Sequence, residues 1–234
     1  MPTARHSSIG SEDLPAWLAT APHVRLKVPS GVRLELLTMT VISTDQGREA
    51  ALIGLFRNRT RNLEGASLTL AYIGPDGESI LRRVPNSARV TAVAAESILP
   101  FRFPLVTKAE LPLPAATFEI SLDEQAGGAR IRVPAGVRGR FSTRAQRGGM
   151  SLAGDIDIGA EPGSPGPDRS GTALTLIVWD KQDRLLDVLS GTADSAGQLN
   201  VHRFSVHSFV PAAGRVGRVE VFAEQRLRSP RPGS

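Results

Sequence analysis

Residues 26–33 read Leu-Lys-Val-Pro-Ser-Gly-Val-Arg, and residues 131–138 read Ile-Arg-Val-Pro-Ala-Gly-Val-Arg. Five of the eight positions are identical, and the other three are conservative exchanges. A match of this kind about a hundred residues apart indicates that the chain contains two copies of one unit. We expect each copy to begin with a strand that ends in a turn at the Pro-x-Gly sequence, because proline and glycine both favour turns.

Around this repeat, short runs of alternating apolar and polar residues predict β-strands. Leu68, Leu70 and Tyr72 alternate with Thr69 and Ala71, and similar runs occur throughout both copies. The 23 glycines and 17 prolines of the 234-residue chain separate the runs at about ten-residue intervals. About seven short strands per copy, with regular turns, predict an all-β protein made of two antiparallel β-sandwiches that arose by internal duplication.

The expected boundaries follow from the repeat. Residues 1–23 form a tail with one short helix, residues 24–124 the first sandwich and residues 129–225 the second sandwich. Residues 226–234 are polar and are expected to be disordered. Asp123 to Gly128 is the expected linker, and the sequence leaves open whether the two units pack together or swing on Gly127-Gly128.

One stretch of the first copy, 52–77, has a pattern of strand, asparagine (Asn58), polar loop, alternating strand and glycine turn. In the second copy Trp179-Asp180 gives an aromatic-Asp pair at the end of the corresponding strand, whereas Tyr72 in the first copy is followed by Ile73. This pattern resembles the FxLYD group of bacterial immunoglobulin-like domains. The resemblance implies tandem immunoglobulin-like β-sandwiches, which generally act as binding or spacing modules.

Composition excludes several classes of site. The chain has no cysteine, so a disulfide framework, thiolate metal ligands and a cysteine nucleophile are all excluded. No apolar run approaches the roughly 20 residues that span a bilayer, and no secretory signal is visible, so we expect no transmembrane segment and a cytoplasmic location. No nucleophile elbow, phosphate loop or dinucleotide fingerprint occurs, so we expect a non-enzymatic protein without a cofactor.

The strongest charge feature is basic. The chain carries a net charge of +5, and residues 125–154 contain no Asp or Glu. On a strand the side chains of Arg138, Arg140 and Arg144 share one face, with Arg147 close by, and we take these four residues as a candidate anion-binding stripe. The alternative is a solvated, charged sheet edge that prevents edge-to-edge aggregation.

The tail offers a second candidate site. Leu14, Trp17 and Leu18 are spaced to share one face of a short helix that begins near Ser11. This face either folds back onto its own domain or docks in a groove of a protein partner.

Acidic and histidine residues give weaker signals. Asp155 and Asp157 share one face of a strand and could form a calcium site with Asp168, although an ordinary solvated edge is the simpler interpretation. The odd spacing of His202 and His207 places them on opposite faces of a strand, so they do not form a metal pair, and no metal site is predicted.

The sequence therefore predicts a protein-interaction or assembly module that binds a protein partner or another copy of itself. The alternative is a binder of an anionic ligand, such as nucleic acid, acidic polysaccharide or a membrane surface, through the arginine stripe.

Overall fold

The computed structural model describes residues 23–43, 50–63, 65–73, 84–85, 92–105, 117–124, 130–158, 172–196, 201–210 and 213–226. These ranges contain thirteen strands and one short 3-10 turn, η2 (Ala213–Arg215). The expected all-β class is confirmed. The predicted tail helix, the Gly127-Gly128 linker and the last eight residues lie outside the described residues.

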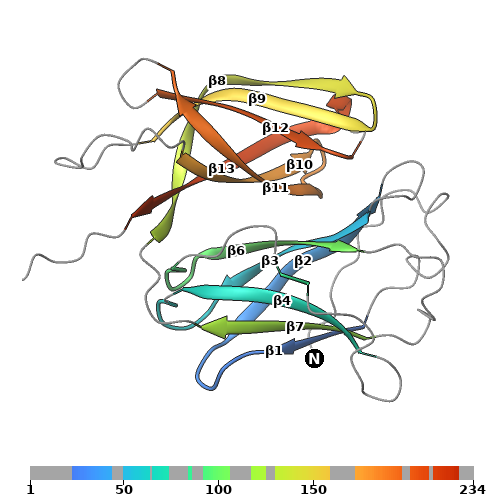
Figure 1. The fold of residues 1–234 in the computed structure, drawn as a ribbon, viewed down its shortest axis with the longest axis vertical. Coiled ribbons are helices and arrows are strands. Elements are labelled where there is room, and N and C mark those ends of the chain that lie inside the picture. Colours follow the sequence, from blue (N-terminus) through green and yellow to red (C-terminus); the bar gives the residue numbers. More distant parts are fainter. Residues whose placement is uncertain are drawn as a thin grey trace, which may run out of the picture.

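The first half of the chain forms two sheets that pack face to face (Figure 1). One sheet has the order β1-β7-β4-β5 and the other the order β2-β3-β6. The strands are β1 (His23–Lys27), β2 (Leu34–Ser43), β3 (Ala50–Asn58), β4 (Ala66–Ile73), β5 (Val84–Pro85), β6 (Ile98–Leu105) and β7 (Thr117–Glu124). Side chains from both sheets form one buried cluster, so this half is a β-sandwich.

A glycine makes room for the aromatic part of that core. The Phe56 and Phe101 rings stack with centroids 4.9 Å apart. Gly54 pairs with Phe101 across β3 and β6, and a Cβ at Gly54 would lie 2.3 Å from the Phe101 ring and 2.6 Å from the Thr38 carbonyl oxygen. Only glycine therefore lets the ring lie over this strand.

The second half is a closed six-stranded barrel with the order β10-β11-β12-β9-β8-β13. Its strands are β8 (Arg130–Gln146), β9 (Gly149–Asp157), β10 (Thr172–Asp180), β11 (Leu185–Ser195), β12 (Val201–Ser208) and β13 (Val216–Arg226). The prediction of a second pair of separate sheets is corrected here. β8 is one continuous strand. Residues 130–135 pair with β13 and residues 136–146 pair with β9, so β8 joins β13 to β9 and helps to close the barrel.

The two copies of the Pro-x-Gly sequence adopt different conformations, and the halves differ at this point. In the first half Gly31 has a φ of 79°, Val32 N–H donates to the Pro29 carbonyl at 3.1 Å, and the resulting turn separates β1 from β2. The expected turn at Pro134-Ala135-Gly136 is wrong, because these residues continue β8 at the point where it changes partner. Strand pairing on both sides supplies the hydrogen bonds that a turn would supply locally.

Despite this difference, the strand pairings of the two halves correspond. The antiparallel pairs β2–β3, β3–β6, β4–β5 and β4–β7 have counterparts in β8–β9, β9–β12, β10–β11 and β10–β13. Gly154 lies opposite Phe204, with its ideal Cβ position 3.1 Å from the ring, as Gly54 lies opposite Phe101. The first strand differs, since β1 runs parallel to β7 whereas β8 runs antiparallel to β13.

The two halves share a core. On β3, Ala50, Leu52 and Phe56 belong to the sandwich core, whereas the alternate residues Ala51, Ile53 and Leu55 belong to the barrel core. The β2-β3-β6 sheet is therefore a middle layer between the four-stranded sheet and the barrel (Figure 1). Because both faces of this sheet are buried, one against each half, the sandwich and the barrel pack against each other.

Candidate anion-binding surface

The outer face of β8, β9 and β12 carries a set of polar side chains that we call the arginine face. Strand alternation points Leu152, Phe204 and Val206 into the barrel and leaves their neighbours outside. Strand register places on this face Arg138, Ser142, Arg144, Ser151, Ala153, Asp155, Asp157, Arg203, Ser205 and His207. We also count with it the exposed Arg140, at a register shift of β8, and Arg147, in the turn between β8 and β9.

Strand register orders these side chains into three rows. The first row is Arg138–Asp155–Arg203, the second Ser142–Ala153–Ser205 and the third Arg144–Ser151–His207. Directly opposed residues on neighbouring strands have Cβ atoms roughly 5 Å apart. The small middle row therefore forms a low strip between two rows of longer side chains.

The first row and the neighbouring Asp157 together are electrically balanced. The Arg203 Nε donates to Asp155 at 3.0 Å, and this hydrogen bond raises the pKa of Arg203 above its ordinary value. The Arg138 guanidinium lies 2.8 Å from Asp157. These exposed pairs add little stability, but they neutralise both carboxylates of the face.

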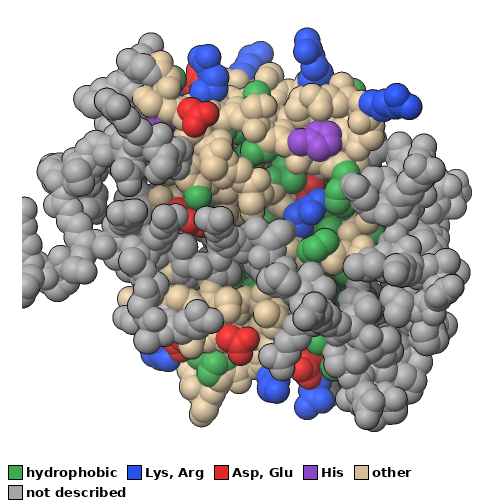
Figure 2. Space-filling model, in the orientation of Figure 1, with side chains coloured by type: hydrophobic (Ala, Val, Ile, Leu, Met, Phe, Trp, Pro, Cys, Tyr) green, Lys and Arg blue, Asp and Glu red, His purple; other side chains and the backbone are tan. Residues whose placement is uncertain are grey.

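The rest of the face is cationic. Arg140, Arg144 and Arg147 are exposed, and no carboxylate among the described residues pairs with any of them. Figure 2 shows Lys and Arg side chains projecting from the top of the view, where Figure 1 places β8 and β9, with a histidine below them. The face therefore presents unneutralised guanidinium groups that can bind carboxylate, sulfate or phosphate oxygens.

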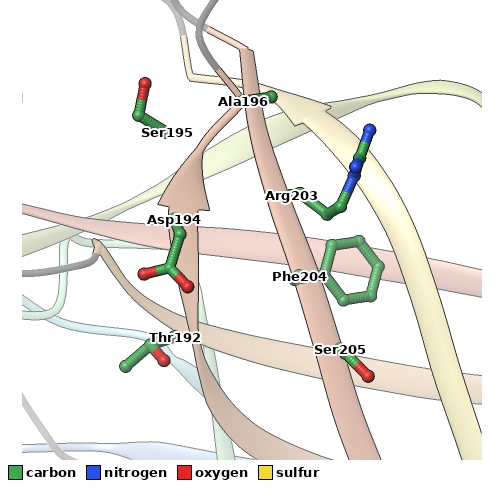
Figure 3. A pocket seen from close by; sticks show the side chains of 7 residues that line it. All are labelled: Thr192, Asp194, Ser195, Ala196, Arg203, Phe204 and Ser205. Atoms are coloured by element: carbon green, nitrogen blue, oxygen red, sulfur yellow. The ribbon is translucent and has the colours of Figure 1, made fainter.

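A shallow hollow adjoins the face where β11 and β12 separate. These strands pair only at Ala193, Asp194 and Ser195, and beyond Ala193 they diverge. The hollow has a volume of about 380 Å³ and is lined by Thr192, Asp194, Ser195, Ala196, Arg203, Phe204 and Ser205. Figure 3 shows Thr192, Asp194 and Ser195 on β11 beside Arg203, Phe204 and Ser205 on β12.

The structure tests the placement of the predicted residues, though not their binding. Arg138, Arg140, Arg144 and Arg147 are all exposed. Strand register places Arg138 and Arg144 on one face of β8, whereas Arg140 lies at a register shift and Arg147 in the β8–β9 turn, so a common face of all four stays a prediction. Arg138 differs from the others because Asp157 neutralises it. The candidate docking residues of the tail, which are Leu14, Trp17 and Leu18, lie outside the described residues.

The weaker acidic and histidine interpretations are also resolved in part. Asp155 and Asp157 each bind an arginine, as expected for a solvated edge, and Asp168 lies outside the described residues. In the described ranges no three acidic or histidine side chains meet as a metal site. His202 is buried and His207 exposed, in agreement with their odd spacing.

Sequence reasoning missed the residues that β11 and β12 bring to the surface. The signal was present, since Ser190, Thr192 and Asp194 alternate with small residues, and Arg203, Ser205 and His207 alternate with Phe204 and Val206. A period of two marks one exposed strand face. Nothing in the sequence alone indicated that β12 lies beside β9.

A second polar cluster is buried at the junction of the halves. Asp187 on β11 is fully buried, and Arg102 on β6 lies 3.1 Å from its carboxylate. Ser208 donates to the other Asp187 oxygen at 2.5 Å, and Val188 N–H donates at 2.8 Å. Burial raises the pKa of Asp187, against the opposing effect of Arg102. The Arg102 guanidinium also stacks 4.6 Å above the Phe209 ring.

The Trp179-Asp180 pair has a structural role. Asp180 is buried at the β10–β11 turn and accepts hydrogen bonds from the backbone N–H groups of Gln182 at 2.8 Å and Arg184 at 2.9 Å. The Arg218 guanidinium lies 4.8 Å from the Trp179 ring centroid. The aromatic-Asp pair of the sequence therefore lies at the end of β10, where Asp180 stabilises the β10–β11 hairpin turn.

Comparison with known protein families finds no family model that matches the chain, and comparison with curated proteins finds no match either. Over its described part, the chain has no helix with the length and apolar character needed to cross a bilayer.

Proposed function

We propose that this protein is a non-enzymatic binding module, and that it binds an anionic polymer through the arginine face. The observation that carries the proposal is the grouping of Arg140, Arg144 and Arg147, exposed and without a carboxylate partner in the described ranges, beside two arginines that are neutralised. A solvated sheet edge that only prevents aggregation does not require three unpaired arginines close together.

Physical chemistry favours this surface as a polyanion site. Arg138 and Arg144 lie on one face of β8, and Arg140 lies between them in sequence at a register shift, so an extended chain of anionic groups can run past these three arginines. Ser142, Ser151 and His207 lie in the same rows of side chains and supply further hydrogen-bonding groups. The net charge of +5 favours approach of an anionic partner at low salt.

We further propose that the two halves are copies of one immunoglobulin-like unit, related to the FxLYD group, and that the second copy closed into a barrel. The corresponding strand pairs and the repeated Gly–Phe contact support this origin. The protein-interaction or assembly role stays a prediction, because its candidate docking residues lie outside the described part of the chain.

Binding to a fluorescent polyanion, measured from about 0.05 to 0.5 M salt, tests the proposal. The variant Arg140→Gln/Arg144→Gln/Arg147→Gln should bind at least tenfold more weakly at low salt. The slope of log K against log salt should fall by about 2 to 3, since each lost contact lowers it by roughly one.

A matched control separates the site from net charge. The variant Arg25→Gln/Lys27→Gln/Arg33→Gln removes the same charge from exposed positions of the sandwich. Its affinity should stay within about threefold of the natural protein, because exposed charges more than about 10 Å apart are largely screened near 0.1 M salt. Equal losses in both variants would show that net charge alone drives binding and would overturn the assigned site.

A further inference from the structure

The hollow between β11 and β12 adjoins the arginine face, and its role as part of a ligand site rests on the proposed function. Arg203 and Ser205 belong to both the face and the hollow, so one ligand can contact both. Thr192 and Ser205 line the hollow together, and Ser205 continues the middle row through Ala153 to Ser142. Hydroxyl side chains therefore lie on β8 and β12, roughly 10 Å apart at about 4.8 Å per strand, and Thr192 of β11 borders the hollow beyond the last strand pair. The Ser142 hydroxyl also donates to the Ala153 carbonyl at 3.3 Å.

These hydroxyl groups are suited to hydroxylated ligands. A hydroxyl side chain both donates and accepts, so it matches the sugar hydroxyl, which does the same. The structure records no hydrogen bond for the Thr192 or Ser205 hydroxyl within the described residues, and Asp194 adds an exposed acceptor for ligand O–H groups. Arg203 supplies donors, although Asp155 shares it.

The surroundings disfavour single-stranded nucleic acid. Proteins that bind single strands without sequence preference stack the bases on exposed aromatic rings. Phe204, the aromatic residue that lines the hollow, is 1% exposed, because its ring packs into the barrel over Gly154. The described face offers hydroxyls, guanidinium groups and the His207 imidazole, and no exposed Phe, Tyr or Trp ring.

We propose that the anionic partner is an acidic polysaccharide, whose acid groups bind Arg140, Arg144 and Arg147 while one sugar unit occupies the hollow beside Thr192, Asp194 and Ser205. Neither group of residues suffices alone. The arginines would attract any polyanion, and the hydroxyl groups distinguish a sugar chain from other polyanions.

Two probes with equal charge test this division. Oligogalacturonate and oligoglutamate of the same number of carboxylates differ in that only the former carries ring hydroxyls. Isothermal titration at about 0.1 M salt should give at least tenfold tighter binding of oligogalacturonate, a difference that one or two extra neutral hydrogen bonds would produce. A DNA duplex of similar charge serves as the nucleic-acid arm.

The variant Thr192→Val/Ser205→Ala should remove this preference and leave oligoglutamate binding unchanged. Both positions are exposed, so the barrel core is untouched. Loss of preference with retained oligoglutamate binding supports the proposal. Equal binding of the two probes by the natural protein, no effect of the variant, or tighter binding of DNA would each overturn it while leaving the proposed function intact. If neither oligomer nor DNA binds, the proposed function itself fails.

Discussion

Asp180 shows how one buried carboxylate can be kept ionised. Burial by itself would raise its pKa, but hydrogen bonds from the backbone and side chain of Arg184 and from the Gln182 backbone outweigh burial, and the pKa is lowered. The Arg184 Nε lies 2.7 Å from the carboxylate. The ionised form therefore stabilises the β10–β11 turn.

Replacing Asp180 by Asn should lower the free energy of unfolding by about 1.5–3 kcal/mol at pH 7, since hydrogen bonds to a charged group are lost. A lowered folded-state pKa stabilises the protein above the unfolded value of about 3.9 and loses this effect as the pH falls through the folded value. Urea unfolding of both proteins should therefore show a difference that shrinks below about pH 4. A difference independent of pH would contradict this explanation.

At the level of elements, the repeated Pro-x-Gly sequence forms a turn in one half and part of a strand in the other. Gly31 has a φ of 79° with open space around its ideal Cβ, whereas Gly136 has no positive φ and its nearest neighbouring atom would be 3.9 Å from a Cβ. Gly31→Ala should cost about 1–2 kcal/mol through backbone strain alone. Gly136→Ala should be neutral or stabilise by up to about 1 kcal/mol.

Thermal or urea unfolding of the two single variants checks this pair, each variant being the control for the other. Equal costs would mean that the motif forms the same turn in both halves, contrary to the continuous β8. The comparison isolates backbone conformation, because neither alanine would meet a close neighbour.

The elements also show what the sequence could predict. Short apolar runs located β3 and β6, and the alternation of Leu174, Leu176 and Val178 located β10. These patterns missed the full length of β8, since Arg138, Arg140 and Arg144 alternate with small or partly buried residues rather than with a strong apolar run. The sequence prediction also missed β11, in which the buried Asp187 interrupts the apolar residues Leu185, Leu186, Val188 and Leu189. Closure of the barrel depends on which strands meet, and local patterns do not encode that.

At the scale of the whole molecule, the sandwich contacts the barrel where strands β11 and β12 meet, next to the arginine face. The backbone ladder between these strands covers only three residue pairs. Farther along, Asp187 of β11 binds Ser208 at the end of β12, and Arg102 of the sandwich binds the same carboxylate. The sandwich thereby fixes the strands that line the hollow, so stability of the junction and shape of the site are coupled.

Arg102→Met should lower the free energy of unfolding by about 3–5 kcal/mol, because it leaves the fully buried Asp187 carboxylate without its cation. Asp187→Asn in the same protein should restore much of this loss, since a neutral amide can still accept from Val188 N–H and donate to Ser208. Urea unfolding of the two single variants and the double variant gives the coupling energy between the residues. Additive losses would show that the pair does not act as a unit. Strong coupling accompanied by two separate unfolding transitions would show that the ion pair forms but that the shared core does not join the halves into one cooperative structure.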